Sequence, residues 1–446
     1  MYIDFFLEKF RDNAEAEALV WNDGIYTYKN ILDYIENDIN FLKEKIHEPL
    51  VVAVEADFSP QAASLLLTLI ELGCTIVPLT SSVAHKKQEF MEIAEVEAII
   101  TLKNDDTFTF ERTEQTAKHE ILCKLKSEKH PGLVLFSSGS TGKSKAAVHD
   151  FLPLLNKFKV PRKCMRMVTF LLFDHIGGVN TLLYVLSNAG CIVTVQSRNP
   201  EDVCRIIEKY KAEVLPTSPT FINLILLSEA YKNYDISSLK MVTYGTEVMP
   251  ESTLVRFHEL FPDIRMLQTY GLSEIGIMRS KSKSSDSLWI KVGGEDFKTR
   301  VVDGLLEIKA KSAMLGYLNA PSPFTEDGWF KTGDSVLVDG EYIKILGRQS
   351  EIINVGGQKV YPAQVESVLQ QMDGVKDVAV NGEQHILTGQ LVKARVMLDT
   401  DETVAEFKKR MRSFCKDKLQ SYQIPQKVII VDHTMFGERF KKMRKE

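Results

Sequence analysis

The sequence predicts an α/β protein with a large N-terminal domain and a small α+β C-terminal domain. Between residues 50 and 269, short apolar segments that fit strands alternate with amphipathic segments that fit helices. That alternation is typical of parallel sheets flanked by helices. At 446 residues the chain is too long for one compact core. Its last part has an alternation of its own, which indicates a second, smaller core.

The large domain begins with an amphipathic region and a short hairpin over 20–28. The alternation that follows predicts strands over 50–55, 75–79, 98–101, 168–173, 191–195, 213–216, 239–244 and 265–269. Helices are expected over 60–72, 87–94, 179–188, 200–210, 219–228 and 251–260. Two polar stretches, 103–130 and 279–285, are expected to be a connector and a linker without regular structure.

Beyond this linker, segments 301–309 and 341–346 fit antiparallel strands of a small barrel-like unit. We place the domain boundary so that the large domain covers residues 1–347 and the small domain covers residues 348–446. Within the small domain we expect strands and helices over 363–372, 375–380, 392–398, 404–419 and 427–431.

The composition is that of an ordinary globular protein, with 44% hydrophobic and 26% charged residues. A net charge of −5 gives no general attraction to nucleic acid or to anionic membranes. No apolar stretch reaches the ~18 residues of a membrane span. The six cysteines lack CxxC spacing, which favours free thiols over disulfides or a zinc site. We therefore expect a cytoplasmic protein without nucleic-acid partners.

The stretch from Ser137 to Lys145 has the composition of a phosphate-binding loop. It follows an apolar run and consists mostly of small and hydroxylated residues, with Lys143 and Lys145 at its end. Such a loop directs backbone amides, hydroxyls and positive charge at phosphate oxygens. It is not a Walker A loop, because Ser137 stands where that motif requires a glycine. The other candidate residues are Ser138, Gly139, Ser140, Thr141 and Gly142.

Three further stretches offer groups that suit a nucleotide. Tyr270-Gly271-Leu272-Ser273-Glu274 combines an aromatic ring that can stack on adenine with a carboxylate that can hold Mg²⁺. Thr332-Gly333-Asp334 ends in a charged acceptor for the ribose hydroxyls. The third stretch runs from Gly347 to Pro362 and contains two adjacent glycines.

Together with the phosphate loop, these stretches resemble the motifs of the acyl-adenylate-forming superfamily. Its members include acyl-CoA synthetases, luciferases and amino-acid adenylation domains. The motifs stand in the family's order, and the resemblance covers nearly the whole chain. It implies that the small domain rotates about a hinge at Ser350. It also implies that Arg348 and Asp334 hold the ribose.

The resemblance also implies roles for single residues. Lys441 is the mobile catalytic lysine, because 441–444 keeps the family's Lys-x-x-Arg spacing, although Phe440 stands where glycine is usual. Lys442 is the alternative. The other catalytic residues implied are Lys143, Lys145 and Glu274, and Glu274 is also the expected Mg²⁺ ligand. Besides the phosphate loop, the residues expected to contact ATP are Gly245, Thr246, Glu247, Tyr270, Gly271, Ser273, Asp334 and Arg348.

Segment 173–178 corresponds to the family's acid-recognition segment, with Asp174, His175 and Gly177 as pocket residues. A histidine in this segment is what similar acyl-CoA synthetases show. An aspartate at 174 is what amino-acid adenylation domains use to bind the α-ammonium group of the substrate. A buried aspartate needs a partner. We expect Asp174 to cap the following helix or to pair with His175, and a substrate ammonium is the other option.

The sequence thus predicts an acid–thiol ligase that uses ATP and Mg²⁺. A small carboxylic acid is converted to acyl-AMP and then to a thioester of CoA or of the phosphopantetheine on an acyl or peptidyl carrier protein. Bringing two anions together requires cations and amide donors at the reacting phosphate. One alternative is an amino-acid adenylating enzyme that loads a separate carrier. Another is a non-catalytic nucleotide-binding homologue, suggested by the departures at Phe440 and Ser144.

Overall fold

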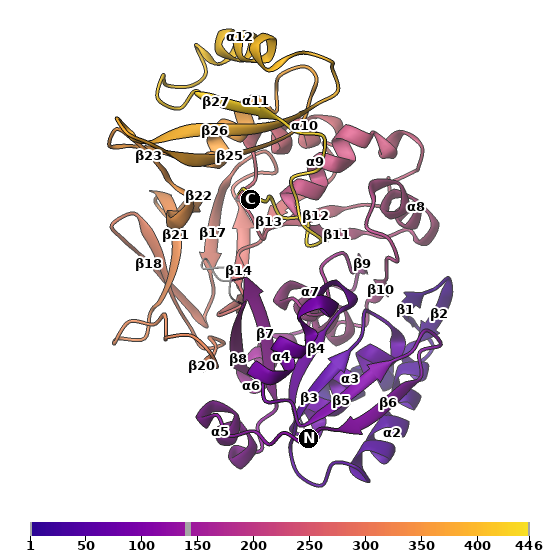
Figure 1. Cartoon of the computed structure of the whole chain (residues 1–446). Coiled ribbons are helices and arrows are strands. Elements are labelled where there is room, and N and C mark those ends of the chain that lie inside the picture. Colours follow the sequence, from indigo (N-terminus) through magenta and orange to yellow (C-terminus); the bar gives the residue numbers. More distant parts are fainter. Residues whose placement is uncertain (1, 139–143, 445–446) are drawn as a thin grey trace.

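Two seven-stranded sheets organise the large N-terminal part of the chain (Figure 1). The computed structural model describes residues 2–138 and 144–444. Both sheets have a parallel central part, as the alternation predicted, with antiparallel strands at their edges. Within the described residues, no helix has the length and apolar character needed to cross a membrane.

The first sheet carries the predicted phosphate loop. Its parallel part, β7-β4-β3-β5, is extended by antiparallel β8 and β20 on one side and β6 on the other. In spatial order the strands are β20 (Gly316–Tyr317), β8 (Ser144–Asp150), β7 (Gly132–Ser138), β4 (Thr75–Leu79), β3 (Val51–Glu55), β5 (Ala98–Leu102) and β6 (Phe108–Arg112).

The second sheet is parallel apart from its edge strand β2. Because the carboxyl ends of parallel strands share one edge, the segments after β11, β12 and β13 lie close together. Its strands are β13 (Arg265–Gln268), β12 (Met241–Tyr244), β11 (Val214–Thr217), β9 (Arg166–Val168), β10 (Cys191–Val193), β1 (Glu17–Trp21) and β2 (Gly24–Thr27).

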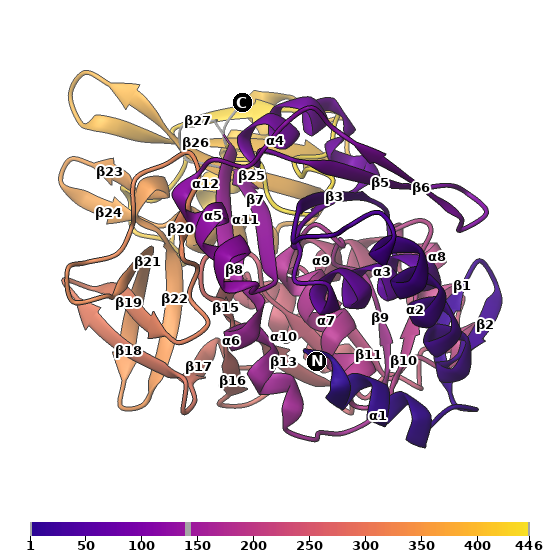
Figure 2. The same ribbon diagram turned by 90° about the horizontal axis from the view of Figure 1, so that it is seen from below.

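Helices cover both faces of each sheet. The largest buried cluster joins residues of β3, β10, α3 and α7, so these two helices lie between the sheets, as Figure 2 shows from below. Helices α8, α9 and α10 cover the far face of the second sheet, and α4 and α5 that of the first. The helices are α1 (Asp4–Asp12), α2 (Tyr28–Lys43), α3 (Pro60–Glu71), α4 (Lys87–Ile93), α5 (Glu120–Glu128), α6 (Phe151–Asn156), α7 (Ile176–Ser187), α8 (Pro200–Tyr210), α9 (Pro219–Ser228) and α10 (Glu251–Leu260).

Several helices begin at a local signal in the sequence. In α3, α8 and α9 a side-chain oxygen accepts a hydrogen bond from a backbone N–H in the first turn, and proline follows directly. Such caps satisfy donors that have no partner inside the helix. The capping residues are Ser59, Asn199 and Ser218.

A six-stranded antiparallel sheet follows. It corresponds to the small barrel-like unit that the sequence predicted. It brings Asp334 and Arg348 opposite each other on β21 and β22. A two-stranded ribbon, β14 (Gly271–Leu272) and β15 (Gly276–Ile277), precedes it. The strands of the sheet are β16 (Arg279–Ser282), β17 (Trp289–Gly293), β22 (Tyr342–Arg348), β21 (Phe330–Asp339), β19 (Leu305–Ala310) and β18 (Phe297–Val302).

The small C-terminal part has its own sheet and its own buried cluster of apolar side chains. The cluster combines residues of this sheet with residues of both helices. The division at residue 348 stays a prediction, since β22 continues through Arg348. The elements are β23 (Ile353–Val355), β24 (Gln358–Val360), α11 (Pro362–Leu369), β25 (Val375–His385), β26 (Gly389–Leu398), α12 (Val404–Cys415) and β27 (Lys427–Ile430).

Four local predictions were wrong. The predicted strand 301–309 contains the turn that joins β18 to β19. The connector 103–130 contains β6 and α5, and the polar linker contains β16. Ser280 and Ser282 of β16 accept hydrogen bonds from the backbone N–H groups of Tyr270 and Gln268, so polar side chains join this strand to its neighbours. The predicted strand 168–173 ends at Val168. Beyond it, the chain leaves the sheet and turns into α7.

Gly178 allows α7 to pack against the preceding loop. A Cβ atom there would lie 1.9 Å from the carbonyl oxygen of Leu172, whereas at Gly177 the nearest atom is the end of the Leu171 side chain at 2.7 Å. We expect Gly178→Ala to lower the free energy of unfolding by about 1–3 kcal/mol, measured by thermal unfolding. Gly177→Ala should cost less, since a leucine rotamer can adjust. Equal stability of the two variants would contradict the packing argument.

Candidate active site

The predicted site residues converge around the C-terminal tail, which we define as residues 431–444. Figure 1 shows this tail, in yellow, running from the small sheet toward the ends of β11 and β12. Burial lowers the pKa of the Lys441 ammonium, and repulsion by Arg439 lowers it further. Glu247 and Glu274 act in the opposite direction. Lys441 therefore lies within electrostatic reach of residues far apart in the sequence.

Glu247 ties the tail to the large domain. Its Oε2 accepts a hydrogen bond from the backbone N–H of Lys442 at 2.9 Å. Its Oε1 accepts one from the N–H of Thr220 at 2.8 Å, in the first turn of α9. One carboxylate thus joins the end of β12, the start of α9 and the tail.

The two tail residues on either side of Met443 are held by the small domain. The Lys442 ammonium pairs with Asp377, and both side chains are about nine-tenths buried. Arg444 makes two hydrogen bonds to Glu366, of 2.9 and 2.7 Å, and one of 2.9 Å to Glu351. Successive residues of an extended chain point to opposite sides. Lys441 is therefore better placed than Lys442 to act in the large domain.

Asp334 and Arg348 form an ion pair, with Oδ1 and Nε 2.9 Å apart. The Tyr270 hydroxyl donates a hydrogen bond to Asp334 Oδ2. Burial raises the pKa of Asp334, and the neighbouring Arg348 counteracts this. The Tyr270 ring itself is buried. The predicted ribose and adenine residues are therefore brought together, and Tyr270 orients the carboxylate.

Glu274 is held by a tyrosine that the sequence did not single out. The Tyr317 hydroxyl donates to Glu274 Oε1 at 2.8 Å, and the Lys145 ammonium lies 5.3 Å from the centre of the Tyr317 ring. His149 is buried, and its Nε2 contacts the carbonyl oxygen of Ser273. Burial lowers the pKa of His149, so the ring is neutral and donates to this carbonyl. These contacts fix the segment that carries Glu274.

The phosphate loop connects two antiparallel strands. Ser137 on β7 is opposite Lys145 on β8, and the backbone of Ser138 is opposite Ser144. Lys145 thus stands directly beyond the loop. The remaining loop residues, Gly139, Ser140, Thr141, Gly142 and Lys143, lie outside the described residues.

The segment after β12 has an unusual backbone. Thr246 has a φ of 72°, a left-handed conformation that is rare for a β-branched residue. Such strain occurs most often at functional sites. A Cβ atom at Gly245 would lie 2.8 Å from the carbonyl oxygen of Thr269, so this position requires a glycine. Thr246 Oγ1 is buried and has no hydrogen-bond partner among the described residues.

Three more buried polar atoms of this kind lie side by side. Thr217, Tyr244 and Gln268 occupy matching register positions at the ends of β11, β12 and β13. Thr217 Oγ1, Tyr244 Oη and Gln268 Oε1 have no partner among the described residues. The carboxyl edge of the second sheet therefore offers hydrogen-bonding groups to a ligand.

Asp174 pairs with the tail, which corrects the expectation that it caps α7 or pairs with His175. Its Oδ2 accepts a hydrogen bond of 3.0 Å from Arg439 Nη2. His175 is the capping residue of α7, because its Nδ1 accepts from the N–H of Gly177 at 3.0 Å. Burial raises the pKa of Asp174, and Arg439 lowers it.

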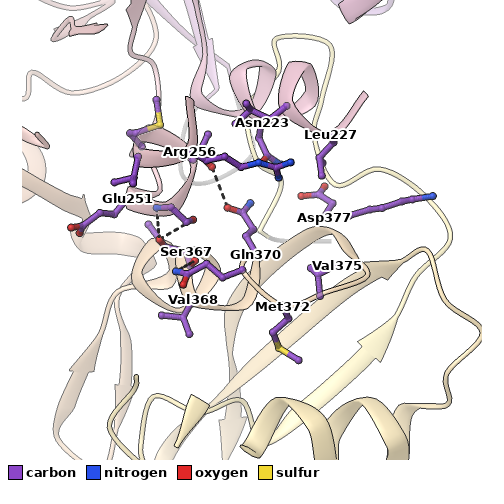
Figure 3. A pocket seen from close by; sticks show the side chains of 18 of the residues that line it. Asn223, Leu227, Glu251, Arg256, Ser367, Val368, Gln370, Met372, Val375 and Asp377 are labelled. Atoms are coloured by element: carbon purple, nitrogen blue, oxygen red, sulfur yellow. Dashed lines mark hydrogen bonds between the residues drawn. The ribbon is translucent and has the colours of Figure 1, made fainter. Parts of the chain in front are cut away.

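A cavity of about 1250 Å³ separates the two domains beside this cluster. Figure 3 shows that its walls are α9, α10, α11 and the start of β25. Ser252 and Thr253 on α10 reach Ser367 and Gln370 on α11 through neutral hydrogen bonds. Among the described residues, none of those predicted to bind ATP or the acid lines it. Ser350, the predicted hinge, is exposed in a short 3-10 helix, Gln349–Glu351.

Sequence reasoning missed Arg439, His149, Thr217 and Tyr317. Each lies next to a predicted residue in space although the two are far apart in the sequence. The ends of the parallel strands were predictable, so the polar residue Thr217 could have been found there. Nothing in the sequence indicated that Tyr317 pairs with Glu274 across about 40 positions.

The comparisons with known proteins agree with this geometry. The model of the AMP-binding enzyme family matches residues 6–294, and that of the AMP-binding enzyme C-terminal domain matches residues 364–435. A Bacillus subtilis protein assigned as an acyl-CoA ligase, YdaB, is 24% identical, over 94% of this chain and 93% of its own. The 2-succinylbenzoate–CoA ligase of Enterococcus faecalis is 25% identical over the same shares of the two chains.

The fold is shared with solved structures. The crystal structure of the anthranilate CoA ligase AuaEII in complex with anthranoyl-AMP superposes with a TM-score of 0.82, over 99% of this chain and 95% of that chain. Its sequence identity is 18%, so this likeness concerns the fold. The first family model covers well over half of the chain. The chain therefore belongs to the AMP-binding enzyme family, as an AMP-forming acid–thiol ligase of the acyl-CoA synthetase type.

Proposed function

We propose that this enzyme uses Lys441 to drive acyl-AMP formation from a carboxylic acid without an amino group, and that it passes the acyl group to the thiol of CoA. The observation that carries the proposal is the place of Lys441 in the tail: the backbone N–H of the next residue, Lys442, is bound by Glu247 of the large domain. The charges of Glu247, Glu274 and Arg348, which come from separate segments, all act on the pKa of Lys441. A cation is needed at that place, because the acid and ATP are both anions.

The chemistry follows from the charges. The substrate carboxylate is ionised at neutral pH and attacks the α-phosphorus without a general base. Pyrophosphate leaves, and charge grows on the phosphate oxygens. Lys441 and Lys145 supply positive charge there. Asp334 and Arg348 hold the ribose, and Tyr270 fixes the carboxylate of Asp334.

Glu274 suits a magnesium ion that arrives with ATP. Mg²⁺ is commonly bound by one or two carboxylates together with substrate phosphates and water. Within residues 2–138 and 144–444, no group of three or more His, Cys, Asp or Glu side chains forms a separate metal site. Tyr317 bonds to one oxygen of Glu274 and so orients the carboxylate. A bound Mg²⁺ supplies charge neutralisation at the phosphates.

The acid class follows from the partner of Asp174. Its charge is balanced by Arg439, so a substrate ammonium is not needed as counter-ion. We therefore favour simple fatty or aryl acids over amino acids. We favour CoA as acceptor because the relatives reported above are CoA ligases. A carrier protein in place of CoA is the alternative.

The departure at Phe440 does not argue against catalysis. Phe440 has a φ of 50°, the left-handed conformation in which glycine is most common. Its ring packs against Phe170 and Phe221, which stabilises this backbone. Ser144, the other departure, is buried, and its carbonyl oxygen accepts a 2.8 Å hydrogen bond from Asn319 Nδ2. Both departures are therefore accommodated without loss of the site.

Lys441→Ala should slow acyl-AMP formation by about 100-fold or more, because a cation at the reacting oxygens is lost. ATP affinity and thermal stability should stay near the wild-type values. The control is Lys442→Ala, which leaves Asp377 buried without its partner and should lower thermal stability instead. Pyrophosphate release in a single turnover measures the rate. An unchanged rate in Lys441→Ala would remove this lysine from the mechanism.

Asp334→Ala should weaken ATP binding by about tenfold or more, since hydrogen bonds to a charged acceptor contribute roughly 1.5–3 kcal/mol each. Calorimetric titration with ATP measures the dissociation constant. The matched control is Asp339→Ala on the same strand, whose carboxylate is exposed and pairs with Lys283. Affinity within about twofold of wild type for Asp334→Ala would show that Asp334 does not hold the ribose.

The acid class is tested by pyrophosphate release over pairs of acids that differ only by an amino group. We expect the acids without the amino group to be preferred, and Asp174→Asn to lower the rates of both members of each pair equally. A selective loss on the aminated acids would establish the amino-acid alternative. No release with any acid would favour the non-catalytic alternative.

A further inference from the structure

We propose that Arg439 is a positioning residue: by pairing with Asp174 in the acid-recognition segment, it latches the tail so that Lys441 stands at the site of acyl-AMP formation. The inference rests on the proposed role of Lys441. It goes further, because it couples the acid-recognition segment to the position of the small domain.

In the Arg439–Asp174 pair, the partner that belongs to the large domain, Asp174, is the more deeply buried one. The Asp174 side chain is 5% exposed and that of Arg439 is 29% exposed. Asp174 Oδ1 has no hydrogen-bond partner among the described residues, so Arg439 supplies the main compensation for this carboxylate. Leaving a buried carboxylate without its cation is costly. Moving the tail away therefore carries an energetic penalty.

Phe440 strengthens the same contact. Its ring centre lies 5.2 Å from that of Phe170 and 5.3 Å from that of Phe221, both in the large domain. The guanidinium of Arg198 lies 5.7 Å from the ring centre of Phe440. The residue between Arg439 and Lys441 is thus seated in an aromatic cluster of the large domain.

The latch acts on Lys441 through the backbone. Arg439 and Lys442 are both fixed to the large domain, by Asp174 and by Glu247 respectively. Lys441 lies between these two anchored residues, so the position of its backbone is fixed. Elsewhere, α10 and α11 meet through neutral hydrogen bonds beside the large cavity. The Arg439–Asp174 pair, in contrast, is a charged contact between the tail and the large domain.

Two half-reactions should respond differently to loss of the latch. Acyl-AMP formation needs Lys441 in this place. Rotation of the small domain, implied by the family motifs, must break the pair before the thioester forms. A weaker latch should slow the first step and spare the second.

The test uses Arg439→Gln, Asp174→Asn and the double variant in the full chain. We expect each single variant to slow acyl-AMP formation by about tenfold, and the double variant to be no slower than either single one. Thioester formation from supplied acyl-AMP should change less than about twofold in all three. Lys427→Gln is the control, since it removes an exposed ion pair with Glu383 inside the small domain.

A second readout does not depend on activity. Hydrogen–deuterium exchange of residues 435–444 without substrates should be faster in both single variants and unchanged in Lys427→Gln. Equal losses in both half-reactions, multiplying losses in the double variant, or unchanged exchange would overturn the latch. A wild-type enzyme that releases no pyrophosphate would overturn the proposed function, whereas the exchange measurement would still decide on the latch.

Discussion

The need to pair every buried carboxylate is the constraint on which this site depends. Asp174, Asp334 and Glu366 are each nine-tenths or more buried, and each meets an arginine. A buried carboxylate without a cation is unstable. Arg439 and Arg444 come from the tail, so their pairs with Asp174 and Glu366 hold distant parts of the chain in one arrangement. Two of these three pairs are made by the tail, which explains how fourteen residues can orient a whole domain.

The tail has two kinds of anchor with different consequences. The side chains of Lys442 and Arg444 bind carboxylates of the small domain. Arg439 and Phe440 contact the large domain instead. The tail is thus attached to the small domain through Lys442 and Arg444, and its contacts with the large domain fix where it lies. In the proposed mechanism, rotation of the small domain keeps the first set of contacts, breaks the second and so withdraws Lys441.

The sequence determined much of the fold, because its signals are local. Alternating apolar and amphipathic segments predicted the parallel strands and the helices between them. It also identified the family motifs around Asp334 and Lys441. Local signals failed where tertiary contacts compensate for polarity, as in β16, where Ser280 and Ser282 bond to neighbouring backbone groups.

Only the tertiary structure decided which charges meet. Asp174 could have capped α7, paired with His175 or waited for a substrate ammonium. Its partner is Arg439, 265 positions away. Lys442 likewise has a distant partner, Asp377 of the small domain, which is why we propose Lys441 as the catalytic lysine. The physical reason is that an ion pair depends on distance in space and on burial, and a sequence records neither until the chain is folded.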